Sequence, residues 1–425
     1  MQSDLGARTL RNLVSPYGLA LISFVFFLAS WLCPPSFYSS VMRERDILFV
    51  NAPTFFFYIL CTSGFIFGVW ISYSREVPLE TPKLSLRISA ASFLLLPLLV
   101  GLLNTAWALL KTFKESPNLL LLIAAQEAAD LKGANSFTTT EQIASTAPTL
   151  VAISWWALWR LWQLRLTGWR AHVVRLTIFI AVLTIVGSSI ITVSRNLIME
   201  TIAGILLLYV LHREAEDRLS WTVAVRISVI FIAGIAILFG AFSFLRGTGS
   251  LDAQFHLLLG YSSASYNRLA ALVTGSLRYP FSGHGLYLSS FVSFNESFHR
   301  LIPLNQILHW PGFFEEWTSE FGAVERAGLD GSLVFLGAFG FVYCDLGWFS
   351  PLWLLMYGLA YGLIWKALRS SSVFGIVLYP FFGFCILFWF GTNLLLDSSL
   401  VPFLKYSIYL FLYEKLLLRQ HLRTA

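Results

Sequence analysis

Long blocks of apolar residues recur along the chain and constrain its fold more than any other feature. An α-helix needs about 20 apolar residues to cross the hydrocarbon core of a bilayer, which is roughly 30 Å thick. Hydrophobic residues make up 57% of the sequence and charged residues only 12%, whereas soluble domains are about 25% charged. We therefore predict an all-α polytopic membrane protein with about ten transmembrane helices.

The predicted spans alternate between the two sides of the membrane. They lie at 17–34, 54–73, 86–110, 147–164, 175–194, 197–212, 223–245, 349–367, 373–392 and 403–418. Lys and Arg favour the cytoplasmic side, so the basic run at 160–175 and the basic C-terminal residues indicate that both termini are cytoplasmic. The net charge of +6 is therefore interpreted as a topology signal, and no nucleic-acid partner is predicted.

One apolar segment, 331–344, is too short to cross the membrane. Counting it as a span would put the basic C-terminal residues outside, so we predict a re-entrant or outer-face helix there. The chain then divides into seven transmembrane helices in 1–245, an outer loop with this helix in 246–348, and three transmembrane helices with a cytoplasmic tail in 349–425.

The outer loop holds most of the candidate functional side chains. It is rich in aromatic residues and carboxylates, which favours a folded cap, and it contains His256, His284, His299 and His309. The glycines on both sides of His284 present it on a turn, and a histidine can act as a general base near neutral pH. We therefore prefer His284 as the catalytic histidine, with an ordinary surface role as the alternative.

Three arginines are predicted near the outer membrane surface: Arg195 between two spans, Arg246 at the start of the loop, and Arg268 within it. A guanidinium group pairs bidentately with phosphate oxygens, and an ionisable group at that depth is costly without a partner. These arginines are candidates to bind the phosphate of a lipid headgroup. The alternative for Arg195 is a snorkelling interfacial side chain.

Carboxylates beside aromatic rings suit a carbohydrate, because they accept hydroxyl hydrogen bonds while the rings cover apolar sugar faces. Glu316 and Trp317, together with Tyr266, are the predicted glycan-binding residues. A solvated acidic helix face is the alternative for the glutamates. The sequence has no Walker loop, HExxH, Rossmann glycine pattern or GxSxG motif, and no metal site or cofactor is predicted.

The order of these features resembles the Wzy-type O-antigen polymerases and the related O-antigen ligases of bacterial inner membranes. The matching positions are Ser194-Arg195, Arg246, Arg268-Leu269, Pro280 with Gly283-His284-Gly285, and the segment 341–350. Ligases carry a His-Asn pair just before the outer-face helix, where this chain has Asp330 in the segment 329–332. This departure favours a polymerase.

The resemblance implies metal-independent glycosyl transfer on the periplasmic face of the inner membrane. A glycan growing on undecaprenyl pyrophosphate would be transferred as a block to an incoming lipid-linked repeat unit. The resemblance also allows a chain-length regulator as a protein partner. The three arginines would stabilise the pyrophosphate, and His284, Asp330 or Asp345 would take the proton of the acceptor hydroxyl. An O-antigen ligase acting on the lipid A core, or a transporter of lipid-linked sugars, is the alternative.

Overall fold

The computed structural model of the chain is built from helices. It describes residues 12–48, 51–73, 79, 84–115, 137–192, 196–216, 222–223, 225–226, 229, 233–234, 240, 256, 259–260, 262–293, 304–311, 313–396 and 399–418. About 79% of this described part is helical and none of it forms a strand, which confirms the all-α prediction there. One isolated antiparallel bridge joins Leu86 to Leu418.

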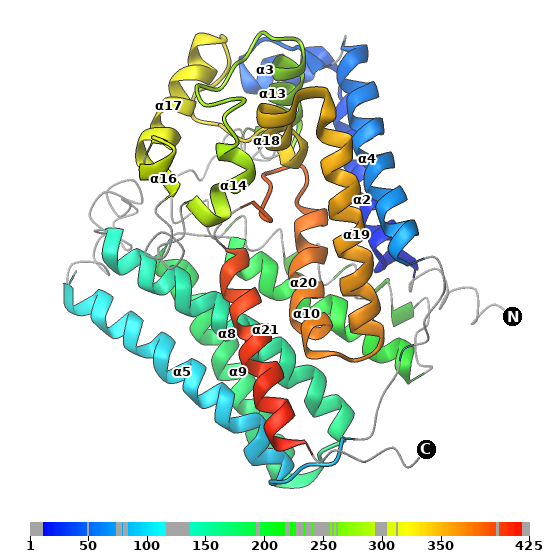
Figure 1. Cartoon of the computed structure of the whole chain (residues 1–425), viewed down its shortest axis with the longest axis vertical. Coiled ribbons are helices and arrows are strands. Elements are labelled where there is room, and N and C mark those ends of the chain that lie inside the picture. Colours follow the sequence, from blue (N-terminus) through cyan, green and yellow to red (C-terminus); the bar gives the residue numbers. More distant parts are fainter. Residues whose placement is uncertain are drawn as a thin grey trace, which may run out of the picture.

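The long helices pack in two groups (Figure 1). The first contains α2 (Pro16–Trp31), α3 (Pro35–Met42), α4 (Ala52–Ser72), α13 (Ser263–Val273), α18 (Gly337–Leu346) and α19 (Ser350–Arg369). The second contains α5 (Ala90–Glu115), α8 (Phe137–Leu164), α9 (Gly168–Ile191) and α21 (Leu400–Leu417). Helix α20 (Val373–Leu387) contacts both groups, and α10 (Asn196–Ala215) packs on α20, α8 and α9.

A helix lies at every predicted span except 223–245, most of which falls outside the described residues. Five helical segments are long and apolar enough to cross a membrane: α4, α5, α9, α10 and the continuous run from α18 through α19. The bent pair α2 and α3 is a sixth candidate, and α20 is apolar but shorter. These helices are typical of a multi-pass membrane protein. The number of crossings, about ten, stays a prediction.

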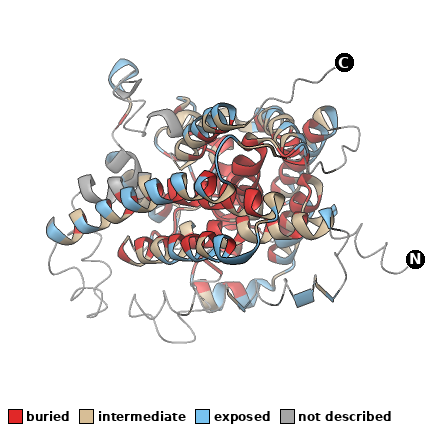
Figure 2. Cartoon of the chain, turned by 90° about the horizontal axis from the view of Figure 1, so that it is seen from below, coloured by how far each residue is buried: buried red, intermediate tan, exposed pale blue. Residues whose placement is uncertain are grey.

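The outer surface of the bundle is apolar. Figure 2 shows buried residues concentrated at its centre and exposed residues around its outside. Large apolar side chains are exposed along α4, α5, α9, α19 and α21; Leu103 is 71% and Trp107 69% exposed. Such a surface would be unfavourable in water and is favourable against lipid tails, so the exposed side chains support the membrane assignment independently of helix length.

Helices α4 and α19 touch through their backbones. Gly64 and Gly68 on α4 face α19, and Gly358 and Gly362 on α19 face α4. A Cβ atom on Gly358 would lie 2.0 Å from the Phe65 carbonyl oxygen. Each helix therefore carries a small-xxx-small pattern that permits close approach without a side chain in between.

The two ends of the bundle are joined by different contacts. At one end, three contacts connect residues at or just beyond the predicted cytoplasmic ends of spans. They are the ion pairs Arg160–Glu414 and Arg369–Glu214 and the bridge Leu86–Leu418. At the other end, α3, α13 and α18 gather with α14 (Leu286–Ser293), α16 (Leu304–Ile307) and α17 (Phe313–Arg326) (Figure 1). The described parts of the outer loop thus form helices at one end of the molecule.

The apolar segment 331–344 becomes helical only from residue 337, where α18 begins. Its first turn is anchored on the chain after α20, since the Ala338 amide donates to the Trp389 carbonyl at 2.8 Å and the Asn393 side chain donates to the Ala338 carbonyl at 3.2 Å. Most of α18 is buried in protein, which is compatible with the predicted re-entrant or outer-face helix. Its re-entrant relation to a membrane stays a prediction.

We expect Gly358→Ala to destabilise the protein by about 1–3 kcal/mol, because the added methyl must push apart two helix backbones. The matched control is Gly187→Ala on α9, where a Cβ would meet no atom within 4 Å. The melting temperature of both variants in detergent tests this. Equal melting temperatures for Gly358→Ala and the control would contradict the close contact.

Candidate functional site

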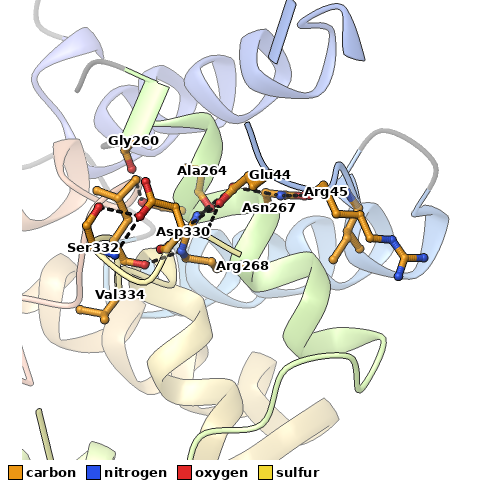
Figure 3. A network of polar contacts seen from close by, with 12 residues as sticks. Glu44, Arg45, Gly260, Ala264, Asn267, Arg268, Asp330, Ser332 and Val334 are labelled. Atoms are coloured by element: carbon orange, nitrogen blue, oxygen red, sulfur yellow. Dashed lines mark hydrogen bonds and ion pairs between the residues drawn. The ribbon is translucent and has the colours of Figure 1, made fainter. Parts of the chain in front are cut away.

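A buried ion pair between Glu44 and Arg268 lies at the centre of the candidate site (Figure 3). The Arg268 Nη1 and Nη2 atoms donate to the Glu44 Oε1 and Oε2 atoms at 3.1 and 2.9 Å. The contact is bidentate, which is the strongest geometry for this pair. Glu44 follows α3 and Arg268 lies on α13, so the pair joins the connection between α2 and α4 to a helix far along the chain.

Arg268 has no free donor in this arrangement. Besides Glu44, its Nε–H donates to the Leu333 carbonyl at 2.5 Å, Nη1 to the Ala264 carbonyl at 3.0 Å, and Nη2 to the Asp330 carbonyl at 2.7 Å. These contacts use all five N–H groups of a guanidinium. Binding a pyrophosphate would require Arg268 to release a partner, which leaves Arg195 and Arg246 as the candidates for that role.

Glu44 organises the surrounding backbone. Its carboxylate also accepts hydrogen bonds from the Tyr38 hydroxyl, from the Asn267 amide at 3.3 Å and from the Asp330 backbone N–H at 2.7 Å. The Asn267 oxygen in turn accepts the backbone N–H groups that follow Glu44 in the chain, at residues 47 and 48. One carboxylate therefore holds α3, α13 and residue 330 together.

Asp330 lies at the edge of this cluster and pairs with His256. The His256 Nε2 and Asp330 Oδ2 atoms are 3.2 Å apart, and the side chains are 37% and 25% exposed. The other carboxylate oxygen, Oδ1, accepts the Ser332 backbone N–H at 2.9 Å and the Ser332 hydroxyl at 2.7 Å. The carboxylate is thus oriented on one side by Ser332 and on the other by an accessible imidazole.

The surroundings of Asp330 lower the pKa of its carboxyl group. Partial burial raises its pKa, but the hydrogen bonds from Ser332 and the positive charges of His256 and Arg268 outweigh burial, so the pKa lies below its ordinary value of 3.8. Asp330 is therefore ionised at neutral pH. The imidazole of His256 lies beside this carboxylate, with Nε2 3.2 Å from Oδ2.

Asp345 binds the backbone next to the turn that carries His284. The Asp345 oxygens accept the backbone N–H groups of Gly285 at 3.0 Å and Leu288 at 2.9 Å, at the start of α14. Gly283 and Gly285 have φ values of +84° and +76°, which glycine adopts without strain. His284 is exposed on this turn as predicted. Asp345 acts as a cap that positions the turn, since both its oxygens already accept backbone donors.

The structure does not describe the side chains of four predicted site residues. Arg195 and Arg246 lie outside the described residues, as do the side chains of Glu316 and Trp317 on α17. Their roles stay predictions, and so does convergence of the three arginines.

Tyr266 requires a correction, because its side chain is fully buried. Its ring packs edge-on against Phe27 and Tyr58, with centroids 5.2 and 5.7 Å away. A sugar cannot reach this ring without opening the core, so Tyr266 has a packing role instead of the predicted glycan contact.

Two features of the site were not predicted from the sequence. Glu44 carries no motif signal, and its partner Arg268 lies 224 residues away along the chain. His256 ranked below His284 because only His284 is flanked by glycines. The signal that identifies His256 is its contact with Asp330, which depends on the tertiary structure.

The site offers acid-base groups but no evident metal centre. Across the described residues, no group of three or more His, Cys, Asp or Glu side chains is arranged to hold a metal ion. Comparison of the chain with protein-family models, curated proteins and solved structures found no match.

We expect Glu44→Gln to destabilise the protein by about 3–5 kcal/mol, because it leaves the buried Arg268 charge without its counter-ion. The double variant Glu44→Gln with Arg268→Met removes both charges and should recover part of the loss. Glu315→Gln, an exposed carboxylate on α17, is the control. Thermal unfolding in detergent measures all three, and a Glu44→Gln protein as stable as the control would contradict a paired, buried charge.

The lowered pKa of Asp330 predicts a pH-dependent contribution to stability. The contribution is fully present above the ordinary value of 3.8 and is lost as pH falls through the lower pKa of the folded protein. Melting temperatures from pH 7 to pH 3 should therefore show Asp330→Asn below the parent protein at neutral pH, with the gap closing in acid. A gap that stays constant over this range would rule out the ionised pair as its cause.

Proposed function

We propose that the protein transfers glycans between lipid-linked carriers, as a polymerase of surface polysaccharide repeat units on the outer face of a bacterial inner membrane. The observation that carries the proposal is the accessible His256–Asp330 pair, at one end of a bundle of apolar helices. Glycosyl transfer to a hydroxyl needs a base near neutral pH, and an imidazole oriented by a carboxylate meets that need.

The reaction exchanges one bond to the anomeric carbon for another. The sugar hydroxyl of the incoming lipid-linked repeat unit attacks the anomeric carbon of the growing glycan, and its proton passes to Nδ1 of His256. The bond from that carbon to the undecaprenyl pyrophosphate breaks, and the pyrophosphate leaves as an anion. Asp330 stabilises the imidazolium that forms, since its carboxylate already faces Nε2 at 3.2 Å.

Charge on the leaving group requires cations near the membrane. Arg195 and Arg246 are the candidates, from their positions in the sequence and the order of motifs shared with the Wzy-type polymerases. Arg268 supports the same reaction differently. Its guanidinium donates to the Asp330 carbonyl at 2.7 Å and so fixes the backbone that carries the catalytic carboxylate.

Two alternatives receive less support. A transporter of lipid-linked sugars would place ionisable residues and broken helices at the membrane midplane, whereas the His256–Asp330 pair and His284 lie on the loop elements at one end of the bundle. A ligase would carry a His-Asn pair before α18, where this chain has Asp330.

We expect a strain lacking this protein to display single repeat units in place of a polymer ladder. His256→Gln should reproduce this defect, with polymer reduced at least about a hundredfold, because the base is lost. Gel analysis of surface glycan measures the ladder, and immunoblotting checks that the variant accumulates. His172→Gln, an exposed histidine on α9, is the control and should restore a full ladder.

The outcomes separate the alternatives. A full ladder from His256→Gln would overturn the assigned base, and loss of the ladder only in His284→Gln would move the base to that turn. Complete absence of repeat units from the lipid A core, with long polymer left on the lipid carrier, would favour a ligase.

A further inference from the structure

Arg43 and Arg45 stand on either side of the buried Glu44, and both are exposed. Arg43 ends α3 in the left-handed backbone conformation, so the chain turns there; Glu44 is buried while the arginines on both sides of it are exposed. Figure 3 shows the Arg45 side chain directed away from the Glu44–Arg268 pair. In the part of the chain that the structure describes, neither guanidinium group has a hydrogen-bond or ion-pair partner.

The backbone beneath these two side chains is fixed. The Arg43 amide donates to the Ser39 carbonyl at 2.9 Å and so closes α3, while the Arg45 carbonyl accepts the Asn267 side-chain amide at 2.8 Å. Glu44 between them is held by its contacts to Arg268. The two cations are therefore presented from a rigid segment, which lowers the entropy cost of binding a ligand between them.

Their position relative to the membrane follows from the geometry of α2 and α3. The two helices are bent by 88°, so α3 runs along the membrane surface if α2 crosses the membrane. Leu32 and Phe37 at this corner are 76% and 45% exposed, as suits side chains dipping into lipid. Arg43 and Arg45 follow directly at the end of α3, which places them at the level of the lipid headgroups.

We propose that Arg43 and Arg45 form a binding site for the phosphate of a membrane-anchored headgroup. Two guanidinium groups provide planar forks that match phosphate oxygens, and the carboxylate between them in the sequence, Glu44, is paired with Arg268. The ligand is either the phosphodiester of an anionic phospholipid or the pyrophosphate of a lipid carrier. The site is independent of the proposed polymerase activity, since it is defined by binding alone.

The test measures binding to the purified full-length protein in neutral detergent. Three probes are added as mixed micelles or in solution: phosphatidylglycerol, undecaprenyl pyrophosphate and inorganic pyrophosphate, with phosphatidylcholine as the neutral reference. The variant Arg43→Gln/Arg45→Gln is compared with Arg278→Gln/Arg326→Gln, which removes two exposed arginines from the outer loop. Both variants change net charge equally, so non-specific attraction falls equally in each.

We expect the Arg43/Arg45 variant to lose affinity for the two anionic lipids, phosphatidylglycerol and undecaprenyl pyrophosphate, by at least about tenfold, from the loss of charge-assisted hydrogen bonds. Its melting temperature without lipid should be unchanged, because both side chains are exposed. The Arg278/Arg326 control should bind like the parent protein. Replacing both residues by lysine should restore binding only in part, because the charge returns without the fork.

The pattern across probes identifies the source of the phosphate. Binding of both lipids indicates an anionic phospholipid site, whereas binding of undecaprenyl pyrophosphate alone, with competition by inorganic pyrophosphate, indicates a carrier site. Equal loss of affinity in the two double variants, or none in the Arg43/Arg45 variant, would overturn the proposal. A missing polymer ladder does not affect the binding measurement. Failure of the polymerase proposal can therefore be distinguished from failure of the binding-site proposal.

Discussion

The ion pair between Glu44 and Arg268 is the interaction on which the end of the molecule with α3, α13 and α18 depends. A charge without a partner in a protein interior costs several kcal/mol, so neither side chain can be buried without the other. Each side chain also forms hydrogen bonds to other parts of the chain. Glu44 accepts them from α3 and residue 330, and Arg268 donates them to α13 and residues 330–333. The position of Asp330, and with it the orientation of His256, follows from this pairing.

Different interactions stabilise the ends and the middle of the bundle. Charged pairs lie near the ends, where Arg160 meets Glu414 at 2.6 Å and Arg369 meets Glu214 at 2.7 Å, both partly or fully buried. Between the ends, the contact of α4 with α19 is made by glycines. In lipid the hydrophobic effect gives no preference for one apolar neighbour over another, so close backbone packing and paired charges must supply the specificity.

The helices were predictable because a run of apolar residues is a local property of the sequence. The ends of α4, α19 and α21 fall within a few residues of the predicted spans. The site was less predictable, since the burial of Arg268 and Tyr266 depends on packing between distant segments. Both residues belong to a loop expected to be accessible, and only the fold shows that α13 is enclosed. The glycine pairs of α4 and α19 are the sequence signal for the close contact between these two helices.

The segment 330–334 is held through main-chain hydrogen bonds as well as through the buried side chains of Leu333 and Val334. Arg268 binds the carbonyls of Asp330 and Leu333, and the Tyr279 hydroxyl donates to the carbonyl of Val334 at 2.5 Å. Carbonyl oxygens are the same in every residue type, so these contacts are indifferent to the side chains they cross. Substitutions between Asp330 and α18 can therefore keep the path of the chain when they preserve the buried apolar side chains at 333, 334 and 336. Related proteins are expected to share the backbone path and apolar character of this segment more closely than its exact residues.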